Sequence, residues 1–266
     1  MFTEFSAEAS VVALYGLQFS PGRLEASYKH LVEWFDSLGC HPDRSGVSGM
    51  GFGEKVGTFD RFDRRLKRNG FEEVRGFDLY RLIPGGDIPG YHWCVNADID
   101  EEDSYCIVGA RSSIAPIPGE SMLSVTRTLI RDLTPIYGIG FRREMDLGPS
   151  LYAMGGCMGL QPWGADKPEG DRIDRWRALG IKQRCYDKGV LRDVYPWNFL
   201  TQLQLSREVE GVPLKQWIEQ DHNRGALSTV ECGVYLWEIQ VAQVAHVRVA
   251  LENAGMVFDV KSAPNQ

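Results

Sequence analysis

The fold is organised around residues 137–159, YGIGFRREMDLGPSLYAMGGCMG. Glycine is used where the backbone needs a positive φ angle or must approach another group closely. Gly138 and Gly140 follow a helical pattern, so the sequence predicts sharp turns there, in a tight connection between a helix and a strand. The alternative interpretation is a shaped surface that receives a ligand or a partner, with the adjacent Arg142 and Arg143 as candidate partner-binding residues.

The chain before this stretch alternates between strand and helix patterns. Residues 9–18 predict a strand, because β-branched and aromatic residues form a short apolar run. Ser20 and Pro21 are typical of the cap and first turn of a helix, which Gly39 ends. Further patterns predict a short helix ending at Gly70, strands at 74–83, 91–99 and 105–110, and a helix at 120–133.

The chain after it repeats this mixture. Residues 161–170, QPWGADKPEG, have the composition of an exposed loop. They divide an N-terminal α+β part, 1–160, from a C-terminal α+β part, 161–266, with one compact domain as the alternative. Later patterns predict a helical segment near 173–179, an extended aromatic segment at 191–201, a short helix after Pro213, one or two strands at 228–239, a helix at 241–253 and a strand at 256–260. We therefore predict an α+β fold, with helices packed on one face of a mostly antiparallel sheet.

Charge and composition limit the class of partner. The net charge is −7, and residues 1–150 carry −6 of it, with 22 acids against 16 bases. Such a chain is a poor nucleic-acid binder, because phosphate contacts need Lys and Arg on one face. We expect instead a basic partner protein. The sequence has no apolar run long enough for a membrane span and does not open with a secretory signal, so we expect a cytoplasmic location.

Two further features are candidates for partner binding. Residues 98–103, DIDEED, predict a strongly anionic hairpin loop that contains Asp98, Asp100, Glu101, Glu102 and Asp103. The spacing fails the calcium pattern of an EF-hand, because Asp103 stands where that loop needs glycine. A solvated loop and a docking patch for basic residues both remain open. Trp163, in a Pro/Gly loop, is the candidate for an exposed anchor, since tryptophan is frequent among binding hot spots.

A search for catalytic or metal-binding motifs finds none. The glycine-rich segment at 49–53, GMGFG, does not fit a phosphate loop or a dinucleotide-binding motif, because Glu54 occupies the last position of the latter. The cysteines and histidines lack zinc spacing. Arg192, Asp193, Tyr195 and Asn198 form a polar group in an aromatic run, which is more typical of a loop anchor than of a pocket. We therefore expect no cofactor, no metal and no enzyme activity.

Several segments, taken in order, resemble one family. They are GMGFG at 49–53, YGIGFRRE and GPSLYAMG within 137–155, LRDVYPWNFLT at 191–201, and then VPLKQWIE, RGAL and YLWEI. This order resembles the immunity protein 52 family of bacterial polymorphic-toxin and type VI secretion systems. The resemblance implies an α+β fold with a G-x-G motif, which Gly49 and Gly51 or Gly138 and Gly140 would supply.

The resemblance also implies a function. Members of that family are encoded beside toxins with a restriction-endonuclease-like nuclease domain, and their implied role is to bind and neutralise the toxin inside the producing cell. No catalytic residues are implied. Two alternatives remain open: an enzyme that acts on a small polar or nucleotide substrate at the glycine-rich loops, and a structural adaptor of a phage or secretion machine.

Overall fold

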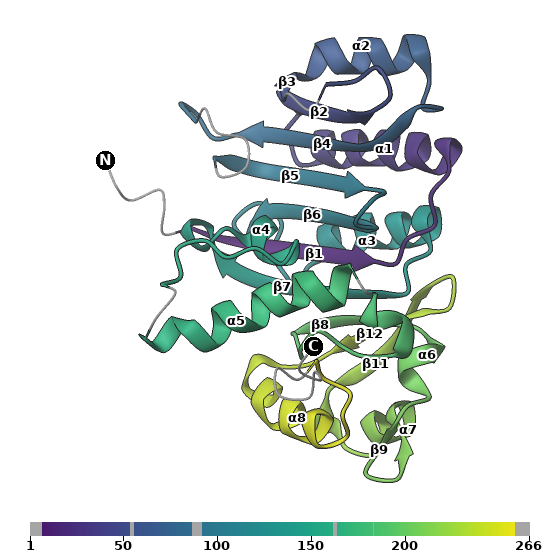
Figure 1. Ribbon diagram of the computed structural model, residues 1–266, viewed down its shortest axis with the longest axis vertical. Helices are drawn as coiled ribbons and strands as arrows, with labels where there is room; N and C mark the ends of the chain where they lie inside the picture. The colour runs from purple at the N-terminus through teal and green to yellow at the C-terminus, as the bar shows by residue number, and fades with distance from the viewer. Residues whose placement is uncertain (1–6, 54–55, 87–91, 162–163, 183, 259–266) are drawn as a thin grey trace.

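The computed structural model describes residues 7–53, 56–86, 92–161, 164–182 and 184–258 (Figure 1). Within these ranges, ten strands form one sheet in the order β11-β12-β8-β7-β1-β6-β5-β4-β2-β3. Each pairing in that sheet is antiparallel. The predicted α+β class is confirmed.

The strands of the sheet come from the whole length of the chain. They are β1 (Glu8–Tyr15), β2 (Arg44–Gly49), β3 (Gly57–Thr58), β4 (Val74–Leu82), β5 (Trp93–Asp100), β6 (Tyr105–Arg111), β7 (Tyr137–Glu144), β8 (Trp197–Leu200), β11 (Ala226–Glu231) and β12 (Val234–Glu238). A separate two-stranded ribbon pairs β9 (Glu208–Val209) with β10 (Val212–Pro213). Strands from both sides of the predicted boundary at residue 160 therefore lie in the same sheet.

The helices divide between the two faces of the sheet, so the predicted packing on one face alone is wrong (Figure 1). On one face lie α1 (Pro21–Ser37), α2 (Phe59–Asn69) and α3 (Glu120–Leu133). On the other face lie α4 (Pro149–Ala153), α5 (Lys167–Arg175), α6 (Gln202–Leu205), α7 (Leu214–Glu219) and α8 (Val241–Asn253). Neighbouring residues of a strand point to opposite faces, and β1 accordingly sends Val12 to the first core and Val11 to the second.

Helix boundaries follow the predicted caps. The Ser20 side chain accepts a hydrogen bond from the Arg23 N–H, with Pro21 opening α1. Gly39, just beyond α1, has a φ of +67°, the left-handed conformation that glycine adopts at low cost. The predicted closing strand is reduced to one bridge, Leu191 with Val257, and residues 259–266 lie outside the described part of the chain. Among the described helices, none has the length and apolar character needed to cross a membrane.

The predicted turn at Gly138 and Gly140 is wrong. Both glycines lie inside β7, between β1 and β8 near the middle of the sheet. Glycine is needed at these two positions because neighbouring atoms approach the backbone closely, and not because of a positive φ angle. A Cβ at Gly138 would lie 2.7 Å from Leu14 Cδ2, and one at Gly140 would lie 2.9 Å from Trp197 Cβ. These glycines let side chains of the two neighbouring strands pack directly over the β7 backbone.

Candidate partner-binding groove

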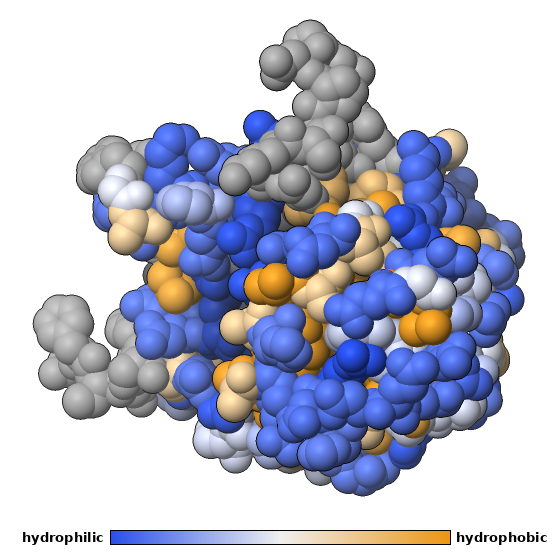
Figure 2. All heavy atoms as spheres, turned by 90° about the horizontal axis from the view of Figure 1, so that it is seen from below, coloured by the Kyte–Doolittle hydropathy of each residue, from blue (hydrophilic) through white to orange (hydrophobic). Residues whose placement is uncertain are grey.

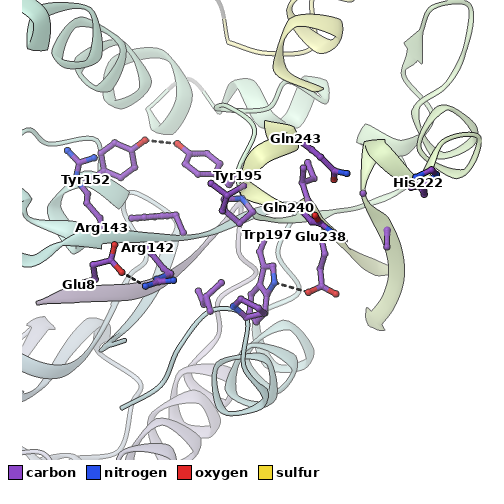
Figure 3. A pocket seen from close by; sticks show the side chains of 18 residues that line it. Glu8, Arg142, Arg143, Tyr152, Tyr195, Trp197, His222, Glu238, Gln240 and Gln243 are labelled. Atoms are coloured by element: carbon purple, nitrogen blue, oxygen red, sulfur yellow. Dashed lines mark hydrogen bonds and ion pairs between the residues drawn. The ribbon is translucent and has the colours of Figure 1, made fainter. Parts of the chain in front are cut away.

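A groove of about 970 Å³ opens at one end of the sheet, where β1 and β8 begin and β7 and β12 end (Figure 3). Its residues come from segments spread over most of the chain. They are Glu8, Ile117, Pro118, Phe141, Arg142, Arg143, Tyr152, Tyr195, Pro196, Trp197, His222, Gly225, Ala226, Glu238, Ile239, Gln240, Val241 and Gln243.

The groove exists because β8 is shorter than its neighbours. β7 has 8 residues and β8 has 4. Their ladder ends at the pair Gly140 and Trp197. Just before β8, the Asn198 side chain accepts from the Tyr195 N–H and donates to the Tyr195 carbonyl oxygen, which holds the chain in a bend. The last residues of β7, 141–144, therefore pair with β1 on one side and border the groove on the other.

Apolar side chains line the groove from both faces of the sheet. Ile117 and Trp197 belong to the core under α3, whereas Phe141 and Ile239 belong to the opposite core. Val241 stands at the rim with 77% of its surface exposed. The end of the molecule that carries α7, α8 and β11 shows hydrophobic side chains interrupting a mostly hydrophilic surface (Figure 2). A large exposed apolar side chain beside an apolar hollow is typical of an interaction site.

The charged groups of the groove are paired. Arg142 forms an ion pair with Glu8, and Arg143 Nη1 lies 2.9 Å from Glu169 Oε1. Trp197 Nε1 donates to Glu238 Oε1 at 3.0 Å. The groove is therefore close to neutral, although Arg142 and Arg143 both line it as candidate binding residues.

Two buried polar atoms of the groove lack a partner in the part of the chain that the structure describes. They are Arg143 Nη2, a donor, and Gln243 Oε1, an acceptor. Leaving such atoms unpaired costs roughly 1–3 kcal/mol each.

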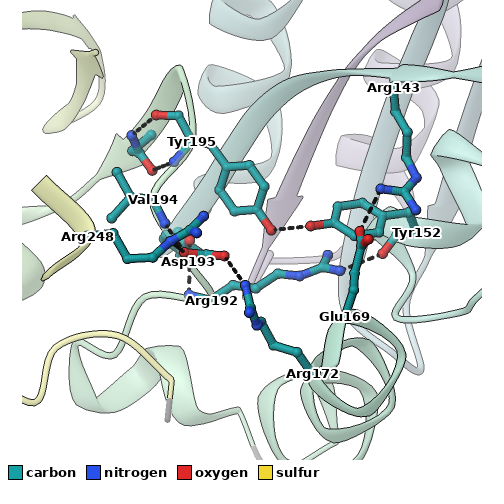
Figure 4. A network of polar contacts seen from close by, with 11 residues as sticks. Arg143, Tyr152, Glu169, Arg172, Arg192, Asp193, Val194, Tyr195 and Arg248 are labelled. Carbon is teal, nitrogen blue, oxygen red and sulfur yellow. Dashed lines mark hydrogen bonds and ion pairs between the residues drawn. The ribbon is translucent and has the colours of Figure 1, made fainter. Parts of the chain in front are cut away.

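A polar network holds the wall behind the groove (Figure 4). The buried guanidinium of Arg192 donates to the Tyr152 and Ala153 carbonyl oxygens. Asp193 accepts from Arg172 at 3.0 Å and from Arg248 at 2.6 Å, so it connects α5 with α8. The polar group therefore holds this segment in place, and Tyr195 also lines the groove.

Tyr195 joins that network to the groove. Its hydroxyl lies 2.9 Å from the Tyr152 hydroxyl, and its ring lines the groove. Burial raises the pKa of Tyr195 well above its ordinary value, so its phenol stays protonated at neutral pH. The tyrosine pair therefore acts as a neutral wall.

The predicted anionic loop, residues 98–103, lies at the opposite end of the sheet, and we name it the acidic turn. Only part of it is available to a partner. Asp98 and Asp100 belong to β5 and are partly buried, whereas Glu101 and Glu102 are exposed. Asp100 Oδ1 accepts from the Asp103 N–H at 2.7 Å, which closes the turn. A depression of about 330 Å³ beside it places Lys182 and Arg184 near Glu101 and Glu102.

The buried acids of this region interact with each other. Asp98 faces Asp78 across the β4–β5 ladder, and their side chains share a hydrogen bond. Burial, followed by the Asp78 charge, raises the pKa of Asp98 well above its ordinary value. Burial likewise raises the pKa of Asp78 to about 6. Burial of two neighbouring carboxyl groups therefore favours their protonated forms, and both groups lie within the sheet, away from the exposed part of the acidic turn.

The other predicted residues are placed as follows. Trp163 lies outside the described residues. Gly49 has a φ of +131° and packs against the Glu73 carbonyl oxygen, which leaves no room for a Cβ. The Met50 N–H donates to Glu73 and the Phe52 N–H to Gly49, while the Gly51 carbonyl oxygen accepts from Arg65. The segment from Gly49 to Gly51 is thus fixed by internal bonds, and it lies away from the groove, which contains neither G-x-G pair.

Most groove residues were missed by sequence reasoning. Ile117, Ile239 and Val241 carry no motif, and the groove depends on where β8 stops. One signal was present in α8, whose sequence VAQVAHVRVALEN spreads its apolar residues around the helix and does not gather them on one face. A helix without a single apolar stripe leaves some apolar side chains at the surface. In the structure Val241 and Val249 of α8 are 77% and 55% exposed.

Comparison with known proteins supports the fold. No family model matches the chain, and no curated protein matches it. Among solved structures, it is similar to the Pseudomonas aeruginosa T6SS protein PA0821, with a TM-score of 0.58 and 12% sequence identity. The match covers 95% of this chain and 73% of the other. At this identity the likeness establishes a shared fold.

Proposed function

We propose that this chain is an immunity protein, which binds and neutralises a cognate secreted toxin inside the producing cell. The observation that carries the proposal is the groove, where an apolar hollow of about 970 Å³ meets the exposed Val241. Apolar hollows bordered by large exposed side chains are the usual location of interface hot spots. The toxin would insert a segment there and lose its freedom to engage its own target.

Three further observations support this proposal. The segments at 49–53, 137–155 and 191–201 resemble the immunity protein 52 family. The fold is shared with a T6SS protein, which is compatible with a secretion setting. The net charge of −7 suits a basic partner, such as a restriction-endonuclease-like nuclease. Within the acidic turn, the exposed Glu101 and Glu102 are the groups that would speed association.

The test is co-expression with the product of the adjacent gene. The proposal predicts that this product arrests growth when expressed alone and that the present chain restores growth. It also predicts a stable complex in size-exclusion chromatography, with a Kd measurable by calorimetry. A product that is harmless alone, or one that forms no complex with this chain, would overturn the proposal.

One observation favours a second candidate, a protein that binds a small molecule. The groove volume of about 970 Å³ lies at the upper end of the range of roughly 300–1,000 Å³ typical of ligand pockets. The glycine-rich segment at 49–53 is less suited to phosphate, since its Met50 and Phe52 N–H groups are already bonded. A thermal-shift screen with nucleotides and polar metabolites tests this candidate, and a shift of several degrees would favour it.

A further inference from the structure

We propose that the groove accepts an extended segment of the partner protein as a short added β-strand beside β7. This inference rests on the proposed function, because it names how the toxin would be held. It starts from the free edge of β7. Residues 141–144 continue past the last β8 pair and have a strand partner on one side only.

The register shows which backbone groups face the groove. The Met145 N–H donates to the Ala7 carbonyl oxygen, in line with the β1–β7 register. In an antiparallel ladder, alternate residues direct both backbone groups to the same neighbour. Phe141 and Arg143 therefore bond to β1, and Arg142 and Glu144 direct their N–H and C=O groups to the other side, into the groove. Among the described residues, no backbone hydrogen bond meets the Arg142 N–H or C=O.

The space beyond that edge has the position of a missing strand. β12 lies two places from β7 in the sheet order, with β8 between them, so their separation is about 9–10 Å at ordinary strand spacing. Past Pro196, whose carbonyl oxygen still accepts from the Ile239 N–H, this interval is occupied by the groove, which is bordered by Gln240 and Val241 on the far side. An added strand would lie there in line with β8.

The groove is lined from both faces of the sheet, as a strand requires. Alternate side chains of a strand point to opposite faces. One set would meet Ile117 and Trp197, and the other would meet Phe141 and Tyr195. An extended peptide uses both sets of contacts at once, because its side chains alternate between the two faces.

Charge and hydrogen-bond complementarity define the chemistry of that peptide. The ion pairs of Arg142 with Glu8 and Arg143 with Glu169 leave little net charge for an incoming ion. The Arg142 N–H and C=O, which face the groove, can bond to the backbone of a peptide. The segment is therefore short, uncharged and apolar on both sides, with backbone groups supplying the polar contacts.

Arg142→Pro tests the added strand, with Arg142→Ala as its matched control. Proline removes the N–H that faces the groove and leaves the β1 ladder intact, because Arg142 does not bond to β1. Both variants lose the ion pair with Glu8, so they differ in the backbone donor and the proline ring. With the product of the adjacent gene as the probe, we expect Arg142→Pro to raise Kd at least tenfold and Arg142→Ala less than threefold.

A second variant protects the test against misfolding of the first. Ala226→Trp fills the groove from the β11 side and leaves β7 unchanged. We expect it to raise Kd at least tenfold, with circular dichroism and a melting temperature like those of the wild type. Each variant is compared with the wild type for secondary structure before its affinity is interpreted.

The outcomes separate the inference from the proposed function. If the wild type binds the product of the adjacent gene and both Arg142→Pro and Ala226→Trp bind it equally well, the added strand is overturned and the immunity function stands. If the wild type forms no complex, both the proposed immunity function and the added strand are overturned. If the wild type dimerises through the groove and Ala226→Trp makes it monomeric, a second copy of this chain is the occupant, and the proposal for a toxin segment is overturned.

Discussion

The two ends of the sheet are built differently. At the end where β7 stops, the groove is apolar, its charges are paired, and an edge of backbone is unoccupied. At the other end the acidic turn presents Glu101 and Glu102, and its remaining acids are engaged within the protein. The groove therefore provides an apolar surface that a partner can fill, whereas the acidic turn provides a long-range electrostatic attraction for a basic partner.

This difference assigns the two ends separate parts in binding. Apolar contact in a desolvated hollow determines how slowly a complex dissociates, while exposed charge mainly changes how fast it forms. Under the proposed function, variants at the groove should therefore change the dissociation rate of the complex with the toxin. Variants at the acidic turn should change the association rate and its dependence on salt.

The largest expected effect is on the stability of the sheet, which positions both the groove and the acidic turn. Gly138→Val places a branched side chain where Leu14 Cδ2 would be 2.7 Å and the Ala13 carbonyl oxygen 3.0 Å from its Cβ. We expect a loss of about 3 kcal/mol in the free energy of unfolding, measured by urea denaturation. Gly53→Val is the control, since a Cβ there meets nothing within 4 Å. Equal losses in the two variants would contradict the close packing of β7 between β1 and β8.

The next effect concerns the rim of the groove. Val241→Asp puts a charge beside the apolar wall, and we expect a tenfold to hundredfold rise in Kd for the toxin, or about 1.4–2.7 kcal/mol. We expect the change in the dissociation rate, which surface plasmon resonance measures. Met50→Asp is the matched control, because Met50 is 72% exposed against 77% for Val241 and lies outside the groove. A similar rise in Kd for Met50→Asp would contradict the assignment of binding to the groove.

A third variant examines the buried acids at the other end. Asp98→Asn replaces a carboxyl whose pKa is raised by burial and by Asp78. A raised folded-state pKa means that the ionised form is disfavoured by folding, so the wild type loses stability as pH rises through about 6, the pKa of Asp78. We expect Asp98→Asn to gain about 1–2 kcal/mol at pH 7.5 and little at pH 4.5, by thermal or urea unfolding. Unchanged toxin affinity would accompany this gain, and a parallel loss of affinity would place Asp98 in the interface.

The smallest effect is expected from the exposed acids. Glu101→Lys with Glu102→Lys should lower the association rate twofold to tenfold at low salt and leave the dissociation rate unchanged. At about 0.5 M salt the difference should nearly vanish, since exposed charges are screened. Stopped-flow association at two salt concentrations measures this. An effect that persists at high salt would mean that the acidic turn contacts the toxin directly.

The sequence predicts the regular elements better than the groove. Helices 120–133 and 241–253 and strands such as 74–83 follow from local periodicity and caps, and the structure confirms them. The segment 137–144 was mistaken for a turn because glycine has two uses, positive φ and close approach. Only the packing of Leu14, Phe199 and Trp197 over β7 shows which use applies.

The groove is formed by residues that lie far apart in the chain, and no local sequence pattern predicts that they come together. Arg142 and Arg143 were identified from the sequence as candidate binding residues, but their neighbours Ile117, Trp197 and Val241 come from segments far away in the chain. Asp98 and Asp100 looked like loop residues because acids are usually exposed. Their alternation with Ile99 places them on the face opposite to the α1–α3 core, and that consequence could have been read from the pattern.

The most direct test of the account is hydrogen–deuterium exchange of this chain with and without the product of the adjacent gene. We expect the complex to slow exchange at residues 141–144 and 238–243, which border the groove, and to leave residues 101–103 of the acidic turn nearly unchanged. Slowed exchange at the acidic turn, with unchanged exchange along β7 and the start of α8, would contradict the assignment of binding to the groove.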